Sequence, residues 1–256
     1  MVFSTPVGPS QTSEAIILRS RTYGESDKIV TFLTADAGKL TGIAKGAKNS
    51  RRRFANCLDP FTRVRVHFRV RPGASLVFMD SCDLLQPPGE FVDPLKFAYG
   101  SYLTELVDQL TAEAQPVSEL YVLLSEGLDE LRNGAATAAL LRGFELRLLH
   151  CAGYGPELLH CVRCHRAIQS DERAFLDPLH GNMVCTSCRT ASESLLPVAG
   201  RTLSVLEAIR VAPLGDVRMR RLGQATAAEA AQLLGHLLAL HLPRSLRSMK
   251  LIAALS

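Results

Sequence analysis

Four cysteines in two closely spaced pairs constrain this sequence more than any other feature. The pairs are Cys161-Val162-Arg163-Cys164 and Cys185-Thr186-Ser187-Cys188, with twenty residues between them. Each C-x2-C pair can place two sulfurs on one ion from a tight turn, and two such turns complete a tetrahedron of thiolates. The sequence therefore predicts a zinc ribbon over residues 161–190. Four cysteine ligands leave no open position for water, so the ion is predicted to be structural.

Other uses of these cysteines fit the sequence less well. A redox C-x2-C motif needs a thioredoxin-like βαβ context, which the pattern lacks. A deaminase would need an H-x-E partner, and none is present. Three histidines lie close enough in sequence to replace one cysteine: His160, His165 and His180. The other three of the seven cysteines are isolated and are expected to be buried as small apolar residues: Cys57, Cys82 and Cys151. With an odd cysteine count and no basic, apolar leader at the N-terminus, we expect a reducing cytoplasm.

Charge is strongly segmented along the chain. Residues 1–86 carry 13 Lys and Arg against 7 Asp and Glu, residues 87–130 carry 1 against 9, and residues 131–256 carry 15 against 9. The formal net charge of +4 therefore conceals segments of +6, −8 and +6. A basic module joined to an acidic one favours a polyanion-binding surface on one side of the molecule.

The basic N-terminal segment has the pattern of a small β-barrel. Residues 1–13 are rich in Pro, Ser and Thr and are expected to be disordered. Five β-type runs follow: Glu14–Ser20, Lys28–Ala35, Lys39–Ala47, Phe61–Val70 and Ser75–Leu85. Five strands without a helical pattern predict an OB-fold barrel over residues 14–86, although an SH3-like barrel or a small sandwich fits the same pattern.

The fourth run separates apolar and basic side chains. Alternation places on one face Thr62, Val64, Val66, Phe68 and Val70, and on the other Arg63, Arg65, His67, Arg69 and Arg71. Neighbours on one face lie about 6.7 Å apart, which is comparable to the spacing of phosphates along a nucleic-acid strand. The pattern favours contact with a polyanion, the alternative being a solvated outer face.

A second basic cluster lies in a loop with Gly46, Asn49 and Ser50, here called the basic loop; its members are Lys45, Lys48, Arg51, Arg52 and Arg53. Flexible Lys and Arg side chains in such a loop can follow a phosphate backbone. Tyr23 and Phe54 could stack on bases, or they could be turn anchors or core residues. The candidate contacts are Arg19, Arg21, Lys39, Lys45, Lys48, Arg51, Arg52, Arg53, Arg63, Arg65, Arg69 and Arg71.

From Pro94 the apolar period becomes helical, and residues 87–160 and 191–256 are predicted to form a helical domain around the ribbon. Its apolar stripes are core, and no catalytic constellation lies on them. The acidic residues of the first part are expected to be a solvated face: Glu105, Asp108, Glu119, Glu126, Asp129 and Glu130. No apolar run approaches the roughly 20 residues of a membrane span, so no membrane association is expected.

These features together resemble the bacterial recombination mediator RecO family. The matching segments are Arg21-Thr22-Tyr23-Gly24-Glu25-Ser26-Asp27, Ala44-Lys45-Gly46-Ala47, Leu58-Asp59-Pro60-Phe61, Phe144-Glu145-Leu146-Arg147-Leu148-Leu149, Gly153-Tyr154-Gly155-Pro156 and Arg244-Ser245-Leu246-Arg247-Ser248. They cover about residues 14–255, and their order around the four-cysteine site makes the match specific. Some family members lack one or more of these cysteines, whereas this sequence has all four.

The resemblance implies a non-enzymatic protein of the cytoplasm and nucleoid that binds single- and double-stranded DNA and anneals complementary strands. With the partner RecR, such proteins help load RecA onto strands coated with single-stranded-DNA-binding protein. For the acidic, apolar tail of that protein the sequence offers Arg142, beside Leu141 and Phe144, which is equally well explained as a solvated arginine near a helix start. Two other functions remain open, an RNA-binding protein acting in transcription or translation and a zinc hydrolase, the latter disfavoured by the four-cysteine set.

Overall fold

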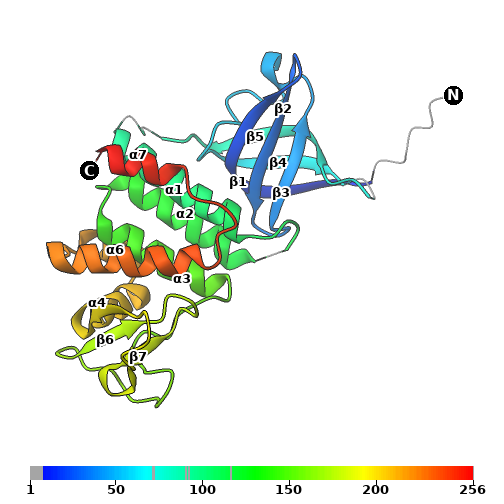
Figure 1. The fold of residues 1–256 in the computed structure, drawn as a ribbon. Coiled ribbons are helices and arrows are strands. Elements are labelled where there is room, and N and C mark those ends of the chain that lie inside the picture. The colour runs from blue at the N-terminus through cyan, green and yellow to red at the C-terminus, as the bar shows by residue number, and fades with distance from the viewer. Residues whose placement is uncertain (1–7, 71–72, 90, 92, 116, 256) are drawn as a thin grey trace. The chain divides into compact units, whose positions relative to one another are not determined.

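The computed structural model describes residues 8–70, 73–89, 91, 93–115 and 117–255. The chain forms two compact units, Met1–Leu128 with Ser248–Ser256 and Asp129–Arg247. The first unit holds a β-barrel, helices from the middle of the chain and the C-terminal helix, and the second holds helices with a small sheet (Figure 1). The division falls inside a helix, whereas the sequence predicted a boundary at residue 86.

The barrel is an OB fold, as predicted. Its strands are β1 (Ser10–Tyr23), β2 (Asp27–Thr34), β3 (Lys39–Ala44), β4 (Arg63–Arg69) and β5 (Val77–Gln86). They close in the order β1-β2-β3-β5-β4, with β3 and β5 parallel and the other neighbours antiparallel. A five-stranded barrel of this topology excludes the SH3-like barrel and the sandwich that the sequence left open.

Strand alternation builds the barrel core. Val64, Val66 and Phe68 of β4 point inward and are buried, and the Phe68 ring meets that of Phe32 edge to face, with centroids 6.3 Å apart. Burial of each such side chain stabilises the fold by roughly 1.5–3 kcal/mol. The predicted apolar face of the fourth run is thus confirmed for these residues, and the opposite side chains point outward.

β1 is longer than its apolar pattern indicated. It begins at Ser10 and pairs with β4 from Ser10 opposite Arg69 to Ile16 opposite Arg63. The expectation of disorder is therefore wrong for residues 10–13. Polar residues can form a strand there because β4 satisfies their backbone groups, a gain that side-chain composition does not reveal.

Three helices belong wholly or largely to the first unit: α1 (Pro94–Leu110), α2 (Ser118–Asn133) and α7 (Ser248–Leu255). α1 begins where predicted because Asp93 caps it, accepting a hydrogen bond of 2.8 Å from the Leu95 N–H. α7 packs on α1, and Ser248 donates its N–H and its hydroxyl to the Glu105 carboxylate at 2.9 and 2.5 Å. The prediction of a solvated face is therefore wrong for Glu105.

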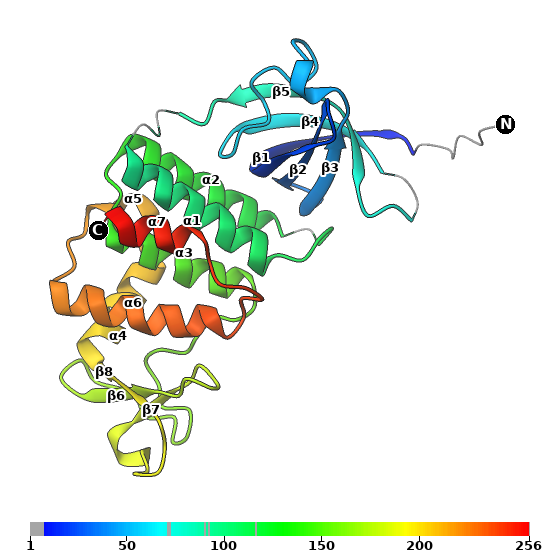
Figure 2. The ribbon, with the colours of Figure 1, turned by 45° about the horizontal axis from the view of Figure 1, so that its top comes forward.

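In the second unit, α4 (Gly200–Val211), α5 (Leu214–Met219) and α6 (Gln224–Ala239) pack around α3 (Ala138–Cys151), as Figures 1 and 2 show. α3 is buried on nearly all sides. At Gly143 an added Cβ would lie only 3.0 Å from Val217 Cγ1, so glycine permits the close approach of α5. α5 was not predicted, because Pro213 and Gly215 interrupt the helical pattern.

A three-stranded sheet completes the second unit: β6 (Arg173–Leu176), β7 (Met183–Cys185) and β8 (Leu196–Ala199), in the order β7-β6-β8. β8 extends the ribbon beyond its predicted end at residue 190. None of the helices in the described part of the chain combines the length and apolarity that crossing a membrane requires.

Candidate metal centre and nucleic-acid interface

The four predicted ligands come together at one end of the small sheet. Cys161 and Cys164 lie in a turn closed by the hydrogen bond from the His165 N–H to the Cys161 carbonyl, 2.8 Å, with His165 at a φ of 57°. Cys185 ends β7, and Cys188 ends the following 3-10 turn η2 (Thr186–Cys188). Two short turns thus present two sulfurs each.

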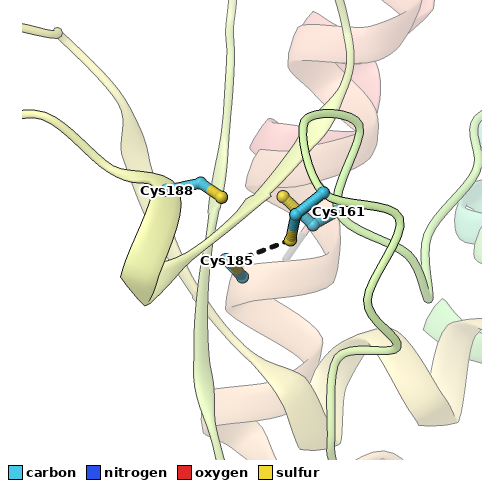
Figure 3. A group of neighbouring side chains, drawn as sticks. Cys161, Cys185 and Cys188 are labelled. Atoms are coloured by element: carbon cyan, nitrogen blue, oxygen red, sulfur yellow. Dashed lines mark hydrogen bonds between the residues drawn. The ribbon is translucent and has the colours of Figure 1, made fainter.

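The four sulfurs have the spacing of a tetrahedral site. All four Sγ atoms lie within 4.8 Å of one another, and those of Cys164 and Cys185 are 3.8 Å apart. Ligands at about 2.3 Å from a tetrahedral ion would be separated by about 3.8 Å. Figure 3 shows the sulfurs of Cys161, Cys185 and Cys188 converging on one space. The site could therefore hold one metal ion.

The pKa values of two of the thiols favour a bound cation. Burial raises the pKa of the Cys161 thiol, but backbone N–H groups of Cys185, Cys164 and Arg163 outweigh burial and bring it to about 6. Hydrogen bonds with the sulfurs of Cys164 and Cys185 raise the pKa of Cys188 to about 12. The first thiolate to form therefore opposes ionisation of the last, and a divalent ion would remove that conflict.

Two of the three nearby histidines are engaged elsewhere. His160 Nδ1 lies 3.1 Å from the Glu157 carboxylate, and His180 Nδ1 lies 2.7 Å from that of Asp177. Within the described residues, the metal-ligating group consists of the four cysteines alone. Of the three isolated cysteines, Cys57 and Cys82 are buried in the barrel and Cys151 is half-buried.

The basic face of β4 is less cationic than its sequence indicated. Asp80 of β5 accepts hydrogen bonds of 2.9 and 3.1 Å from Arg69 Nε, and Asp83 of β5 lies 2.9 Å from His67 Nε2. On the other side, Glu14 of β1 lies 3.4 Å from Arg65. The neighbouring strands thus supply the acids that the run itself lacks.

Three further candidates are also held within the first unit, and a fourth lies outside the described residues. Arg63 is half-buried and hydrogen-bonds Ser125. Lys39 is only 8% exposed; its ammonium lies 3.3 Å from Asp108 Oδ1, and it also donates to the Asp108 carbonyl. Arg19 Nε lies 3.2 Å from Asp108 Oδ2. Asp108 is therefore not part of a solvated face, and Lys39 lacks the exposure that a DNA contact needs. Arg71 lies outside the described residues.

The basic loop folds onto the turn between β1 and β2. The Gly46 N–H donates to Asp27 Oδ1 at 2.9 Å, and Lys45 Nζ lies 2.7 Å from Asp27 Oδ2. The Lys48 N–H donates to the Ser26 carbonyl at 3.0 Å. The Gly46 N–H, followed by the Lys45 ammonium, lowers the pKa of Asp27 to about 2. Gly46 itself has a φ of 67°, a left-handed conformation that glycine adopts without strain.

This arrangement exposes the loop cations. Arg51 and Arg52 are exposed and make no hydrogen bond or ion pair with any described residue. Arg53 is also exposed, but it donates to the Lys45 carbonyl at 2.8 Å and lies 5.2 Å from the centre of the Phe54 ring. Phe54 is buried, which makes it a core residue, whereas Tyr23 is 52% exposed.

We use the term basic end for one group of residues: Arg21, Tyr23, Lys28, Lys45, Lys48, Arg51, Arg52 and Arg53. Arg21 and Lys28 lie near each other because β1 and β2 pair antiparallel, with Arg21 opposite Ile29 and Lys28 opposite Thr22. Lys28 was not among the residues predicted from the sequence, because an isolated lysine at a strand start carries no signal until its loop neighbours are known. A pocket of about 420 Å³ opens here beside Lys28, Lys48 and Arg51.

Arg142 is placed differently from its prediction. It is only 8% exposed on α3, and its Nη2 lies 2.7 Å from Glu145 Oε1. Glu145 is fully buried. A buried ion pair of this kind offers no surface to the tail of another protein, so neither the partner-binding role nor the solvated arginine fits its position.

Comparison with known proteins agrees with this architecture. Residues 10–88 match the family model described as recombination protein O N terminal, and residues 92–250 match the one described as recombination protein O C terminal. Proteins named DNA repair protein RecO are similar over most of their length. That of Anaeromyxobacter sp. (strain K) is 35% identical over 238 residues, 93% of each chain. That of Syntrophus aciditrophicus (strain SB) is 34% identical over 246 residues, 94% of each chain. That of Myxococcus xanthus (strain DK1622) is 36% identical over 241 residues, 94% of this chain and 96% of the relative.

Proposed function

The chain belongs to the RecO family of DNA repair proteins, and on that premise we propose that it is a non-enzymatic recombination mediator. In this proposal it binds single- and double-stranded DNA through the basic end of the OB barrel and anneals complementary strands. With RecR it helps load RecA onto strands coated with single-stranded-DNA-binding protein. Its place of action is the nucleoid in the cytoplasm.

One observation carries the DNA-binding part of the proposal: the exposed and unpaired cations of the basic end. Arg51 and Arg52 have no internal partner among the described residues, and Lys48 engages only the Gly24 carbonyl with its ammonium, at 2.9 Å. Phosphate contacts replace water and counterions around such side chains without breaking internal ion pairs. The β4 arginines, in contrast, would have to share their charge with Asp80 and Glu14.

The same surface suits annealing. A protein that pairs two strands must hold their backbones and leave the base edges free. Lys and Arg side chains do this, since phosphate contacts carry no sequence information. Tyr23 is the one aromatic side chain of the basic end with substantial exposure, at 52%, so base stacking would be limited to about one position.

We propose further that the four-cysteine site binds one Zn(II) ion. Thiolates in tetrahedral arrangement are the preferred ligands of structural zinc, and the donor set here consists of sulfur only. Bound zinc would supply charge neutralisation and a cross-link between the two turns. Because all four positions are taken by protein, the residues offer no site for an activated water, which supports a non-enzymatic role.

A fluorescence annealing assay tests the proposal. Complementary labelled strands are mixed with the purified protein, with and without single-stranded-DNA-binding protein, and RNA of equal length and sequence competes in a parallel series. Faster annealing of coated DNA with preference for DNA supports the mediator. Tighter binding to RNA without annealing would replace it with the RNA-binding alternative.

A further inference from the structure

The pocket at the basic end has features that general phosphate binding does not require. It lies between the start of β2, the 3-10 turn η1 (Ala47–Asn49) and residues 50–59. Lys28, Lys48 and Arg51 line it, together with the amide of Asn56 and the carboxylate of Asp59. Lys28 lies at the start of β2, whereas Lys48 and Arg51 lie in the loop after β3, so the fold brings cations from two separate segments together around one volume.

The charge of the pocket is positive and available. Three cations face one carboxylate, which leaves a formal charge of +2. Lys28 and Arg51 make no side-chain hydrogen bond or ion pair with any described residue, so their charges are not neutralised from within. A phosphomonoester carries about −1.5 to −2 at pH 7, whereas a phosphodiester inside a strand carries about −1. The pocket therefore complements a monoester better than a diester.

The size of the pocket indicates what is attached to that phosphate. At about 420 Å³ it falls in the range of small-molecule sites, roughly 300–1,000 Å³, and greatly exceeds the share of a few waters. Its lining also includes Ala47, Phe54 and Leu58, buried side chains of the barrel core. A cationic pocket of this volume suits a nucleotide, with the phosphate against Lys28 and Arg51 and the sugar or base in the space that remains.

We propose that this pocket binds the terminal phosphate of a DNA strand together with its last nucleotide. The inference rests on the proposed function, since it assumes that the basic end binds DNA. It adds that the protein distinguishes a phosphorylated strand end from the interior of a strand. Lys28 and Arg51 contact the phosphate, and residues 54–58 contact the nucleotide.

Fluorescence anisotropy with single strands of one sequence, labelled internally, tests this. The strands end in a 5′-phosphate, a 3′-phosphate or hydroxyls at both ends. One phosphorylated strand should bind about three- to tenfold tighter than the hydroxyl strand, because a dianion makes stronger charge-assisted hydrogen bonds than a monoanion. Thymidine monophosphate, added as a competitor, should reduce that preference if it binds in the same pocket. Binding of the monophosphate without any preference for phosphorylated strands would indicate a site for free nucleotides.

Two neighbouring arginines make a matched pair of variants. Arg51→Ala removes a pocket cation, and the preference for the phosphorylated end should fall to about onefold. Arg52→Ala removes an exposed cation that does not line the pocket, so it should weaken all strands equally and leave the preference unchanged. Lys28→Ala provides a second pocket variant, and thermal unfolding of each protein verifies folding. If Arg51→Ala is unstable, Arg51→Gln removes the charge while keeping a side chain of similar length, and the preference for the phosphorylated end should likewise be lost.

The outcomes separate this inference from the proposed function. Equal binding of all three strands overturns the pocket assignment but leaves DNA binding intact. Loss of the end preference in Arg52→Ala as much as in Arg51→Ala also overturns it, as does thymidine monophosphate binding without any end preference. Absence of DNA binding in the wild type refutes both.

Discussion

Removing two cations of the basic loop should lower the salt dependence of DNA binding by a calculable amount. The change is the double substitution Arg51→Ala/Arg52→Ala. Neither side chain makes a hydrogen bond or an ion pair with any described residue, so the double substitution removes no such interaction from the described fold. Each phosphate contact with a single strand contributes about −0.7 to the slope of log K against log salt concentration. If Arg51 and Arg52 each contact one phosphate, the slope in the variant should be less negative by about 1.4.

That slope also fixes the expected loss of affinity. Counterion release from two phosphates makes the binding constant about 25-fold larger at 0.1 M salt than at 1 M salt. At 0.1 M salt the binding constant of the variant should therefore be lower by a factor of about this size. Fluorescence anisotropy with a labelled single strand at several salt concentrations measures both quantities. A variant of matched charge, Arg220→Ala/Arg221→Ala, removes two exposed neighbouring arginines from the second unit and should change the slope little.

A comparison with β4 sharpens the test. The sequence alone favours the arginines of β4 as the principal contacts, but Asp80 and Glu14 already neutralise Arg69 and Arg65. The variant Arg65→Ala/Arg69→Ala should therefore change the slope by less than the loop variant does. An unchanged slope in the loop variant, or a larger change in the β4 variant, would refute the assignment of DNA contacts to the basic end.

Three further predictions follow from particular contacts. Cys164→Ser should lose the bound zinc and lower the unfolding temperature, whereas Cys151→Ser should retain the metal, as elemental analysis and thermal unfolding would measure. A wild type that contains no metal and unfolds at the same temperature as Cys164→Ser would contradict this prediction. Lys39→Met should destabilise the protein by about 2–4 kcal/mol, since it leaves Asp108 without its buried partner, yet DNA affinity should not change; denaturant unfolding and anisotropy separate the two effects. The pKa of Asp27 is about 2 in the folded protein and about 3.9 in the unfolded chain. The stabilisation that its carboxylate gives the basic loop is therefore complete above pH 5 and is lost as the pH falls from about 4 through 2. The chemical shift of the Gly46 amide, measured by NMR, should titrate near pH 2, and a midpoint near pH 4 would contradict the hydrogen bond.

The sequence predicted well those features that depend on local spacing. The two C-x2-C pairs fixed which four sulfurs meet, because each turn is only four residues long. The alternation in β4 identified Val64, Val66 and Phe68 as core. The start of α1 was also predicted, since the Asp93 cap and Pro94 are adjacent in the chain.

Features that depend on pairing between distant segments were not predictable in this way. Asp80 and Asp83 face the β4 arginines only because β4 pairs with β5, and Lys39 is buried only because Asp108 lies against it. The polar residues 10–13 form a strand because β4 offers them backbone partners. In each case the deciding partner lies elsewhere in the sequence, where a pattern read along one run cannot detect it.

The distribution of paired and unpaired cations bears on the proposed strand annealing. On β4, the neighbouring strands supply acids that hold two arginines in place, since Glu14 pairs with Arg65 and Asp80 pairs with Arg69. In the basic loop, Asp27 fixes only the backbone at Gly46 and the side chain of Lys45, and Arg51 and Arg52 stay unpaired within the described residues. The loop is thus anchored at its base while its outer cations keep their rotamer freedom. A strand held by such side chains can shift its register at little cost, since no base is bound specifically, and that freedom is what a protein needs if two complementary strands are to find their correct pairing on its surface.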